Sequence, residues 1–373
     1  MASVCDIAVL GATPAGFAAA TRLAGRGCDV IVLDTPAESV QSPLSDWVPG
    51  DFFRQKGLPS GLATAADAKP FQRVLYHSAD MARDAEYSGR SVAGYLLHHG
   101  SLLAVLREVA TDKGVKVRRT NTRPTVELDE DEVRCVGTCQ VRAQLAIVAQ
   151  DRPDEVVAQL SLPIRSVPRA EMVIAGMDIP LRSASEGQAV AGAVHVIQSR
   201  EQSEMGLFFL ADPRTLHVRV LSTSAAHGTR ARELSALINT LQVEGTLPTS
   251  LRLDKATGAV WHPPAGGALD LETHVAKRCL LAGTAGGFAD SITGQVLAPS
   301  VRSAILAADA AADALRADDP QQALKAFETA WREDLAALLR PPNTPLQMLL
   351  PLLFVNERMV SKFTEALLYG EPI

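Results

Sequence analysis

The sequence has few of the features that mark secreted or membrane-spanning proteins. Its five cysteines are an odd number spread over 373 residues, so they do not form the framework of a disulfide-stabilised domain. The uninterrupted apolar part of the C-terminal tail is much shorter than the roughly 20 residues that cross a bilayer. The N-terminus lacks the basic region and cleavage site of an export signal. We therefore expect a cytoplasmic protein.

Several kinds of site also lack their motifs. The 36 Lys and Arg residues are outnumbered by 42 Asp and Glu, which gives a formal net charge of -6 and argues against nucleic acid as a partner. Cys135 and Cys139 are the only close cysteine pair, and no second Cys or His pair completes a metal site. No Ser-His-Asp order and no HExxH pattern offers a hydrolytic mechanism. We expect no metal and no nucleic acid.

The most informative segment that is present covers residues 6–34, which read DIAVLGATPAGFAAATRLAGRGCDVIVLD. An apolar run ends at Gly11, an alanine-rich helix follows Gly16, and a second apolar run closes on Asp34. In a dinucleotide-binding βαβ unit, the glycines allow a tight turn and close packing, the helix N-terminus binds a pyrophosphate, and the acid accepts from a ribose hydroxyl. Thr13 stands where this pattern has its second glycine. A βαβ unit without a nucleotide therefore remains the alternative.

The length of 373 residues suits a two-domain protein, and the periodicity of apolar residues predicts its α/β elements. With 47% hydrophobic residues, the chain can bury a sizeable core. Residues 35–69 are rich in Pro, Ser, Asp and Gly, which predicts a long irregular connection. Residues 91–113 have a broad apolar face at helical spacing, which predicts one helix. Strands are predicted at residues 115–117, 125–128, 132–136, 144–148 and 278–282, and within a β-rich block (160–223) at 190–197, 206–210 and 216–221. Further helices are predicted at residues 229–241 and 301–315, followed by a helical tail at 320–373.

The order of these parts resembles the flavoproteins of the para-hydroxybenzoate hydroxylase fold, especially the geranylgeranyl reductase and flavin-dependent halogenase branch. The resemblance covers most of residues 4–315. It rests on GATPAG from Gly11 with Asp34, HHGSLLAVLREVATDKGVKV from His98, AQLAIVAQDRP from Ala143, and RCLLAGTAGGFADSITGQVLAPSVRSAILAAD from Arg278. It implies an α/β fold: a Rossmann-like FAD-binding domain with a parallel central sheet, an inserted antiparallel β-sheet substrate domain and a helical C-terminal tail. The implied boundaries are 1–159 and 258–318 for the discontinuous FAD-binding domain, 160–257 for the substrate domain and 319–373 for the C-terminal helical segment.

The resemblance implies FAD as the cofactor. The implied cofactor-binding residues are Gly11, Thr13, Pro14, Ala15, Gly16, Asp34, His99, Asp151, Gly283, Thr284, Thr293, Gly294 and Gln295. Gly283 and Thr284 would meet the pyrophosphate and ribityl region, and residues 293–295 would lie beside the isoalloxazine ring. Histidine is the natural acid or base at neutral pH. His99 and His262 are the catalytic candidates, because both flank segments that resemble flavin contacts.

Five positions depart from the family pattern. Thr13 replaces glycine, His99 an arginine, Arg152 a glycine, Thr284 an aspartate and Val296 a small residue. Threonine is a weaker partner for a ribityl hydroxyl than a carboxylate is. The alternative to an enzyme is therefore a binding or accessory protein that has this fold and has lost FAD.

The implied activity is that of an FAD-dependent oxidoreductase, either a monooxygenase or a reductase, whose substrate is apolar or aromatic and is either a small molecule or bound to a carrier or protein. The Trp-x-Trp-x-x-Pro stretch of halogenases is absent. The chain has one convincing dinucleotide unit, so electrons would come from NAD(P)H that binds transiently or from a separate flavin reductase. The tail is predicted to pack on the body of the protein, with peripheral membrane contact as the alternative.

The resemblance also predicts how distant segments meet. Strands within residues 5–33, 143–148 and 278–281 should belong to one sheet, because each precedes a turn that resembles a flavin contact. The largest cavity should lie between residues 160–223 and the loop 292–296, lined by apolar side chains.

Overall fold

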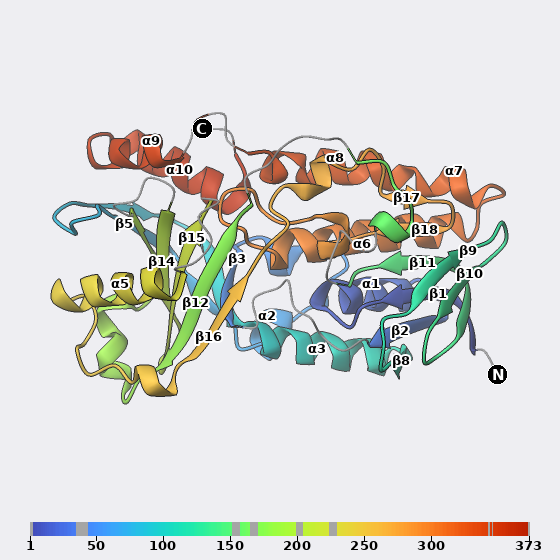
Figure 1. Cartoon of the computed structure of the whole chain (residues 1–373), viewed down its shortest axis with the longest axis horizontal. Helices are drawn as coiled ribbons and strands as arrows, with labels where there is room; N and C mark the ends of the chain where they lie inside the picture. Colours follow the sequence, from blue (N-terminus) through green and yellow to red (C-terminus); the bar gives the residue numbers. More distant parts are fainter. Residues whose placement is uncertain are drawn as a thin grey trace.

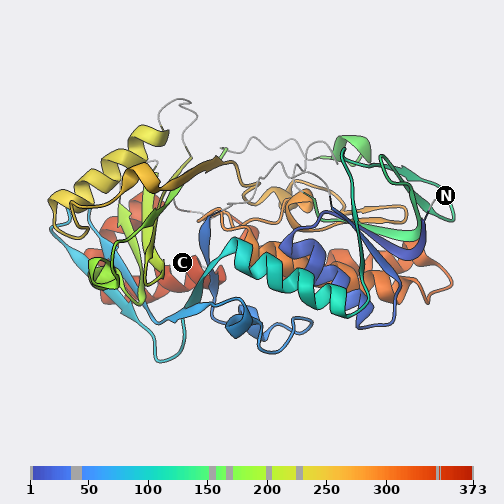
Figure 2. The ribbon, with the colours of Figure 1, turned by 90° about the horizontal axis from the view of Figure 1, so that it is seen from below.

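The computed structural model describes residues 3–34, 44–150, 157–164, 171–198, 204–223, 230–341, 344 and 346–371. Two larger sheets lie towards opposite ends of an elongated molecule, and strand β3 of a small third sheet lies between them (Figure 1). The N-terminal strand belongs to the first sheet, whereas the last helix of the chain lies over the second sheet (Figures 1 and 2).

The first sheet joins strands that are far apart in the sequence. Its order is β17-β18-β11-β1-β2-β8, with β10 paired to β11 and β9 paired to β10. Its four central pairings, between β1 and β11, β1 and β2, β2 and β8, and β11 and β18, are parallel. The strands are β1 Ser3–Leu10, β2 Val30–Asp34, β8 Lys116–Arg119, β9 Thr125–Leu128, β10 Val133–Val136, β11 Val141–Val148, β17 Val275–Ala276 and β18 Cys279–Leu281. The prediction that residues 5–33, 143–148 and 278–281 share one sheet is confirmed.

Both faces of the first sheet are buried. Ile7 and Val9 point into a core shared with the helices, whereas Ala8 and Leu10 point into a second core beneath β9 and β10. This double burial explains why the parallel strands read as continuous apolar runs. The longest helices of the first core are α1 Pro14–Ala24, α3 His99–Asp112, α6 Leu297–Ala314 and α8 Ala326–Leu339. Alanine-rich α1 and α6 pack directly on each other.

The second sheet has the order β16-β12-β15-β14-β13-β5-β6 and is antiparallel except where β13 pairs with β5. One face packs on helix α5, and the other shares an apolar core with the third sheet and helix α10. The strands are β5 Arg73–His77, β6 Asp84–Ser88, β12 Val173–Pro180, β13 Ala193–Gln198, β14 Glu204–Asp212, β15 Thr215–Ser222 and β16 Thr257–Trp261. β5 and β6 come from the segment assigned to the FAD-binding domain, so this sheet combines distant stretches of chain. The domain boundaries remain a prediction.

The third sheet corrects the expectation of one helix over residues 91–113. It pairs β7 with both β3 and β4, and α3 begins only at His99. Leu96 and Leu97 point into different cores, so this strand is apolar on both faces and lacks the alternation that usually marks a strand. The strands are β3 Ser45–Pro49, β4 Lys69–Phe71 and β7 Gly94–His98. The segment 35–69, expected to be irregular, therefore contains a core strand.

The C-terminal tail packs on the body of the protein. Phe363 and Leu367 of α10 are buried against the second sheet, and the Tyr76 hydroxyl lies 2.6 Å from Thr364 Oγ1. Among the described residues, no helix is both long and apolar enough to cross a membrane. The remaining helices and helical turns are η1 Phe52–Arg54, α2 Leu62–Ala65, η2 Ala184–Val190, α5 Arg230–Val243, η3 Leu253–Lys255, η4 Gly267–Leu269, η5 Gly283–Gly286, α7 Pro320–Leu324, α9 Leu346–Leu349, η6 Leu350–Phe354 and α10 Glu357–Tyr369.

Candidate functional site

The turn between β1 and α1 requires both of its glycines. Gly11 has a φ of +113°, and a Cβ at this position would lie 2.7 Å from the Gln150 backbone. A Cβ at Gly16 would lie 1.9 Å from the Gly11 carbonyl oxygen. The turn is therefore tight and the helix sits close to the strand, which is the geometry of a dinucleotide-binding turn.

Thr13 caps helix α1. Its Oγ1 accepts a hydrogen bond from the Gly16 amide over 3.1 Å and donates one to the Ala149 carbonyl oxygen over 2.9 Å. Pro14 follows in the first turn, where its missing N–H has no intrahelical partner to lose. The threonine in the glycine position is thus engaged with the protein itself, and it joins this turn to the end of β11.

Asp34 ends β2 at the same edge of the sheet. Its Oδ2 lies 3.5 Å from Nη1 of Arg107, which projects from α3. Arg107 also lies over the ring of Phe17, at 5.9 Å from the ring centroid. The acid predicted to bind ribose is therefore half-buried and faces a cation that the sequence analysis did not single out.

The glycine turn that follows β18 meets the turn that follows β1. A Cβ at Gly283, where φ is +61°, would lie 3.1 Å from the Ala15 Cβ. Fully buried Thr284 donates to the Gln150 carbonyl oxygen over 3.3 Å. The turn after β1, the end of β11 and η5 therefore converge, which brings together two groups of predicted cofactor residues. Asp151 lies outside the described residues.

The loop at residues 290–296 is organised by Asp290, which the sequence analysis missed. Its carboxylate accepts from the amides of Ile292 (2.9 Å) and Thr293 (3.1 Å) and from the Thr293 hydroxyl. Burial raises the pKa of Asp290 to about 6, although these hydrogen bonds oppose the shift. Gln295 donates from Nε2 to the Trp47 carbonyl oxygen over 2.8 Å and accepts the Ala298 amide at Oε1. The loop is thereby held between the third sheet and α6.

The same loop touches the second sheet. Gly294 has a φ of +65°, and a Cβ there would lie 2.5 Å from Met172 Sδ, 2.8 Å from Ile174 Cδ1 and 2.8 Å from Pro263 Cγ. All three neighbouring atoms belong to apolar side chains. The residues predicted to lie beside the flavin ring therefore meet the face of the second sheet that carries Ile174.

The two candidate histidines differ in their surroundings. His99 is the first residue of α3, and burial lowers its pKa although the charge of nearby Asp46 opposes this. His262 is exposed and follows Trp261 at the end of β16. Its neighbour Pro263 contacts Gly294. Both histidines thus flank elements of the site, and no hydrogen bond joins them within the described part of the chain.

A buried ionic cluster on the second sheet was also missed. Asp178, His217 and Arg219 project from β12 and β15 towards the third sheet, where Arg219 Nη2 lies 2.9 Å from Asp46 Oδ1. The sequence signal was available: residues 215–222 read TLHVRVLS, a strand with a His and an Arg on the same face as an apolar core residue.

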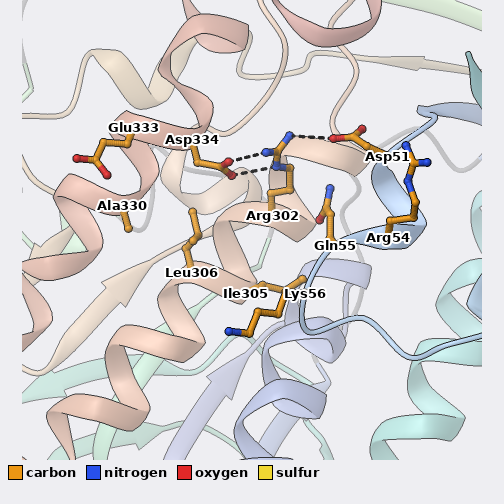
Figure 3. Close-up of a pocket in the computed structure, with 10 residues that line it drawn as sticks. All are labelled: Asp51, Arg54, Gln55, Lys56, Arg302, Ile305, Leu306, Ala330, Glu333 and Asp334. Atoms are coloured by element: carbon orange, nitrogen blue, oxygen red, sulfur yellow. Dashed lines mark hydrogen bonds and ion pairs between the residues drawn. The ribbon is translucent and has the colours of Figure 1, made fainter.

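A separate cavity lies between η1, α6 and α8 (Figure 3). Its volume is about 620 Å³. Arg302 pairs with Asp334 and lies 3.8 Å from Asp51 at its wall. None of the predicted cofactor residues lines it. The predicted cavity beside residues 292–296 remains a prediction.

The fold and these turns define a dinucleotide-binding α/β protein with an added β-sheet. The sequence matches the FAD binding domain family over residues 4–229. The chain belongs to this family of flavin-dependent enzymes, and FAD is its cofactor. The resemblance from which the sequence analysis argued is thereby confirmed.

Solved structures share this fold along almost the whole chain. A geranylgeranyl bacteriochlorophyll reductase-like protein from Thermoplasma acidophilum has a TM-score of 0.75 at 15% identity, covering 100% of this chain and 98% of that one. A flavin-dependent brominase has a TM-score of 0.72 at 14% identity, with 99% and 94% covered. A p-nitrophenol 4-monooxygenase from Pseudomonas putida has a TM-score of 0.69 at 16% identity, with 98% and 95% covered. At these identities the likeness concerns the fold. None of the curated proteins compared matches the chain.

Proposed function

We propose that this FAD-dependent oxidoreductase acts as a monooxygenase or reductase on an apolar or aromatic group bound beside the contact between the second sheet and residues 292–296. The observation that carries the proposal is the packing of Gly294 against Met172 and Ile174. The loop assigned to the flavin ring abuts an apolar wall. An apolar wall with few polar groups favours an apolar substrate.

The residues at the converging turns fit an FAD. Gly11 and Gly16 keep the turn tight and α1 close to β1, and the positive end of the helix dipole at the N-terminus of α1 favours a pyrophosphate. We assign the adenosine and pyrophosphate end to residues 11–16 and Asp34, the ribityl region to Gly283 and Thr284, and the ring to residues 293–295. His99 and Asp151 complete this assignment. Bound FAD supplies two-electron redox chemistry, and the chain supplies position, charge and exclusion of water.

His99 suits proton transfer better than His262. Because burial lowers its pKa, His99 is neutral at neutral pH and can accept a proton at a ring nitrogen. His262 is exposed, so in the proposed enzyme it would have to reach a substrate from the rim of the site.

The partners follow from the same assignment. The substrate is a small molecule or is bound to a carrier, and electrons come from transiently bound NAD(P)H or from a separate flavin reductase. The domain boundaries proposed are 1–159 with 258–318, 160–257, and 319–373. Within the part of the chain that the structure describes, one dinucleotide-binding turn supports a stably bound nucleotide.

The absorption spectrum of the purified protein tests the cofactor, and substitutions on the second sheet test the substrate wall. We expect two visible flavin bands, and a change of these bands when aromatic or isoprenoid compounds are added. Ile174→Ala, which trims the wall without burying a charge, should reduce that change and keep the flavin bands. Val260→Ala, at a site 53% exposed on β16, is the control.

The outcomes separate the alternatives. A colourless protein that binds no added FAD would support the binding or accessory protein instead of the enzyme. A yellow protein whose bands respond to apolar compounds equally in wild type and Ile174→Ala would contradict the assignment of the substrate to this wall.

A further inference from the structure

A chain of hydrogen-bonded side chains leads from the surface into the interface between the second and third sheets. It consists of Asp212, His98, Ser45, Asp178, His217 and Arg219. The outer side chains are accessible, with 37% of His98 and 26% of Asp212 exposed, whereas His217 is 0% and Arg219 only 2% exposed. A surface histidine is therefore connected to a buried cation.

The proton positions at the buried end follow from donors and acceptors. Arg219 has only donors, and its Nε lies 2.8 Å from His217 Nε2, so this ring nitrogen accepts. The other nitrogen, Nδ1, lies 2.6 Å from Asp178 Oδ1 and therefore carries the ring proton. Burial, with the Arg219 charge, lowers the pKa of His217 to about 4, so the ring is neutral at neutral pH.

At the exposed end, His98 Nε2 lies 2.7 Å from Asp212 Oδ2. Partial burial by itself raises the pKa of Asp212, but hydrogen bonds from His98 and from the Arg214 amide outweigh it and lower the pKa overall. The carboxylate is ionised and accepts, so His98 Nε2 carries a proton. The role of the second ring nitrogen, Nδ1, depends on whether His98 holds one proton or two.

Ser45 joins the two ends. Its Oγ lies 2.8 Å from His98 Nδ1 and 2.9 Å from Asp178 Oδ2, and it has one proton to donate. When His98 is neutral, Nδ1 accepts that proton, and Asp178 Oδ2 keeps only the Ser45 amide at 3.0 Å. When His98 holds a second proton, Nδ1 donates to Ser45 and the hydroxyl turns to Asp178. Only the second arrangement makes both short contacts hydrogen bonds.

We propose that His98 and Ser45 are positioning residues: a proton taken up from solvent by His98 turns the Ser45 hydroxyl towards Asp178 and so sets the hydrogen bonding of the Asp178, His217 and Arg219 unit. No bond other than hydrogen bonds and the N–H of His98 changes in this step. In such networks each hydrogen bond polarises its neighbours, so the change at Ser45 reaches Arg219.

The buried end of the chain leads to the cofactor loop. Arg219 holds Asp46, which precedes Trp47, and the Trp47 carbonyl accepts from Gln295 Nε2. Protonation of His98 is thereby linked to the loop assigned to the flavin ring. This last link rests on the proposed function, whereas the hydroxyl reorientation does not.

The other titratable groups around His98 keep their state near neutral pH. Burial by itself raises the pKa of Asp178, but hydrogen bonds from His217 and Ser45 outweigh it and lower the pKa overall. Asp178 therefore stays ionised, like Asp212. His217 and neighbouring His99 stay neutral because burial lowers their pKa. Arg219 remains charged and paired with Asp46 on β3. The contact between Ser45 Oγ and His98 Nδ1 is therefore the place where this hydrogen-bond network has two proton arrangements.

Nitrogen NMR of the full chain labelled with ¹⁵N-histidine tests the reorientation. Signals are assigned with His98→Gln and His217→Gln, and pH is varied over the range in which the protein stays folded. In wild type, the His217 Nδ1–H signal should move in step with the His98 signals. In Ser45→Ala that movement should be lost, whereas Ser60→Ala, at an exposed serine, should behave as wild type.

Two results would overturn the proposal. One is a His217 signal that ignores the titration of His98 in wild type, which decides the matter even if Ser45→Ala does not fold. The other is a His217 signal that follows His98 equally well in Ser45→Ala.

A second measurement tests the link to the cofactor loop. In FAD-loaded wild type, the visible bands should shift with pH in step with the His98 signals, and Ser45→Ala should lose this shift. Flavin bands that do not shift with pH would contradict the proposed link between His98 and the loop. A protein that binds no FAD would contradict the proposed function, while the NMR result would still decide the role of Ser45.

Discussion

The Thr13 hydroxyl donates to the Ala149 carbonyl oxygen over 2.9 Å while it accepts the Gly16 amide. One side chain thus caps α1 and joins it to the end of β11. The residue that departs from the glycine of the dinucleotide pattern has a structural role that glycine cannot fill. The departure at Thr13 is therefore compatible with an intact turn.

Thr13→Gly should lower the free energy of unfolding of the apoprotein by about 1 to 2 kcal/mol, because it removes a helix cap and a hydrogen bond between elements. Thr13→Ser keeps the hydroxyl and is the matched control. Urea denaturation measures both. Equal stability of the glycine and serine variants would show that the hydroxyl contacts contribute nothing.

Gly294→Ala should disrupt the loop against the second sheet. The substituted residue would have to keep a left-handed backbone conformation, and its Cβ would lie 2.5 Å from Met172 Sδ. Gly61→Ala is the control, since φ is +78° there and nothing lies within 4 Å of the added Cβ. Overpacking costs roughly 1 to 3 kcal/mol, so Gly294→Ala should lose about that much more stability than Gly61→Ala and bind FAD more weakly. Urea denaturation and FAD titration measure these effects, and indistinguishable variants would contradict the packing of Gly294.

Asp290 should make stability fall as pH rises from about 4 to 6. Burial raises its pKa from 3.8 to about 6, so the folded protein holds the proton more tightly than the unfolded chain does. The resulting stabilisation is fully present below pH 4 and is lost as pH rises through 6, a change of about 3 kcal/mol.

Comparison of Asp290→Asn with wild type isolates this contribution. The stability of wild type relative to the variant, measured by urea denaturation at several pH values, should decrease between pH 4 and 6 and then level. Asp254→Asn, where the side chain is 71% exposed, serves as the control. A constant difference between wild type and Asp290→Asn would show that Asp290 is already ionised throughout this range.

The buried ion pair of Arg219 and Asp46 should show strong coupling. Arg219→Met leaves a buried carboxylate without its cation, and Asp46→Asn leaves the cation without its carboxylate. Each should cost roughly 3 to 5 kcal/mol of stability, and the double variant much less than the sum. A double-mutant cycle measured by denaturation checks this, and additive losses would mean that the pair does not interact.

Local patterns were enough to predict the dinucleotide unit and the first sheet. Gly11, Gly16 and Asp34 lie within one βαβ unit, where short-range sterics dictate the residue types, and β9 was predicted with the observed bounds Thr125–Leu128. Residues 143–148 and 278–281 were assigned to this sheet because the order of apolar strands and glycine turns carries that information. Family membership and the FAD cofactor followed from the same residues.

Only the tertiary structure showed what depends on pairing between distant segments. The apolar pattern of residues 94–98 predicts helix although they form β7, because both faces of this strand are buried. β5 and β6 join a sheet whose other strands follow much later in the sequence. The hydrogen-bonded side chains from His98 through Ser45 to Arg219 could not be predicted for the same reason. They come from β3, β7, β12, β14 and β15, and no local pattern indicates which polar side chains meet. By itself the sequence determined the short-range geometry of the nucleotide turns, because sterics act between near neighbours. The partners of each buried polar group were decided by the packing of sheets, because a hydrogen bond depends on position in space and not on separation along the chain.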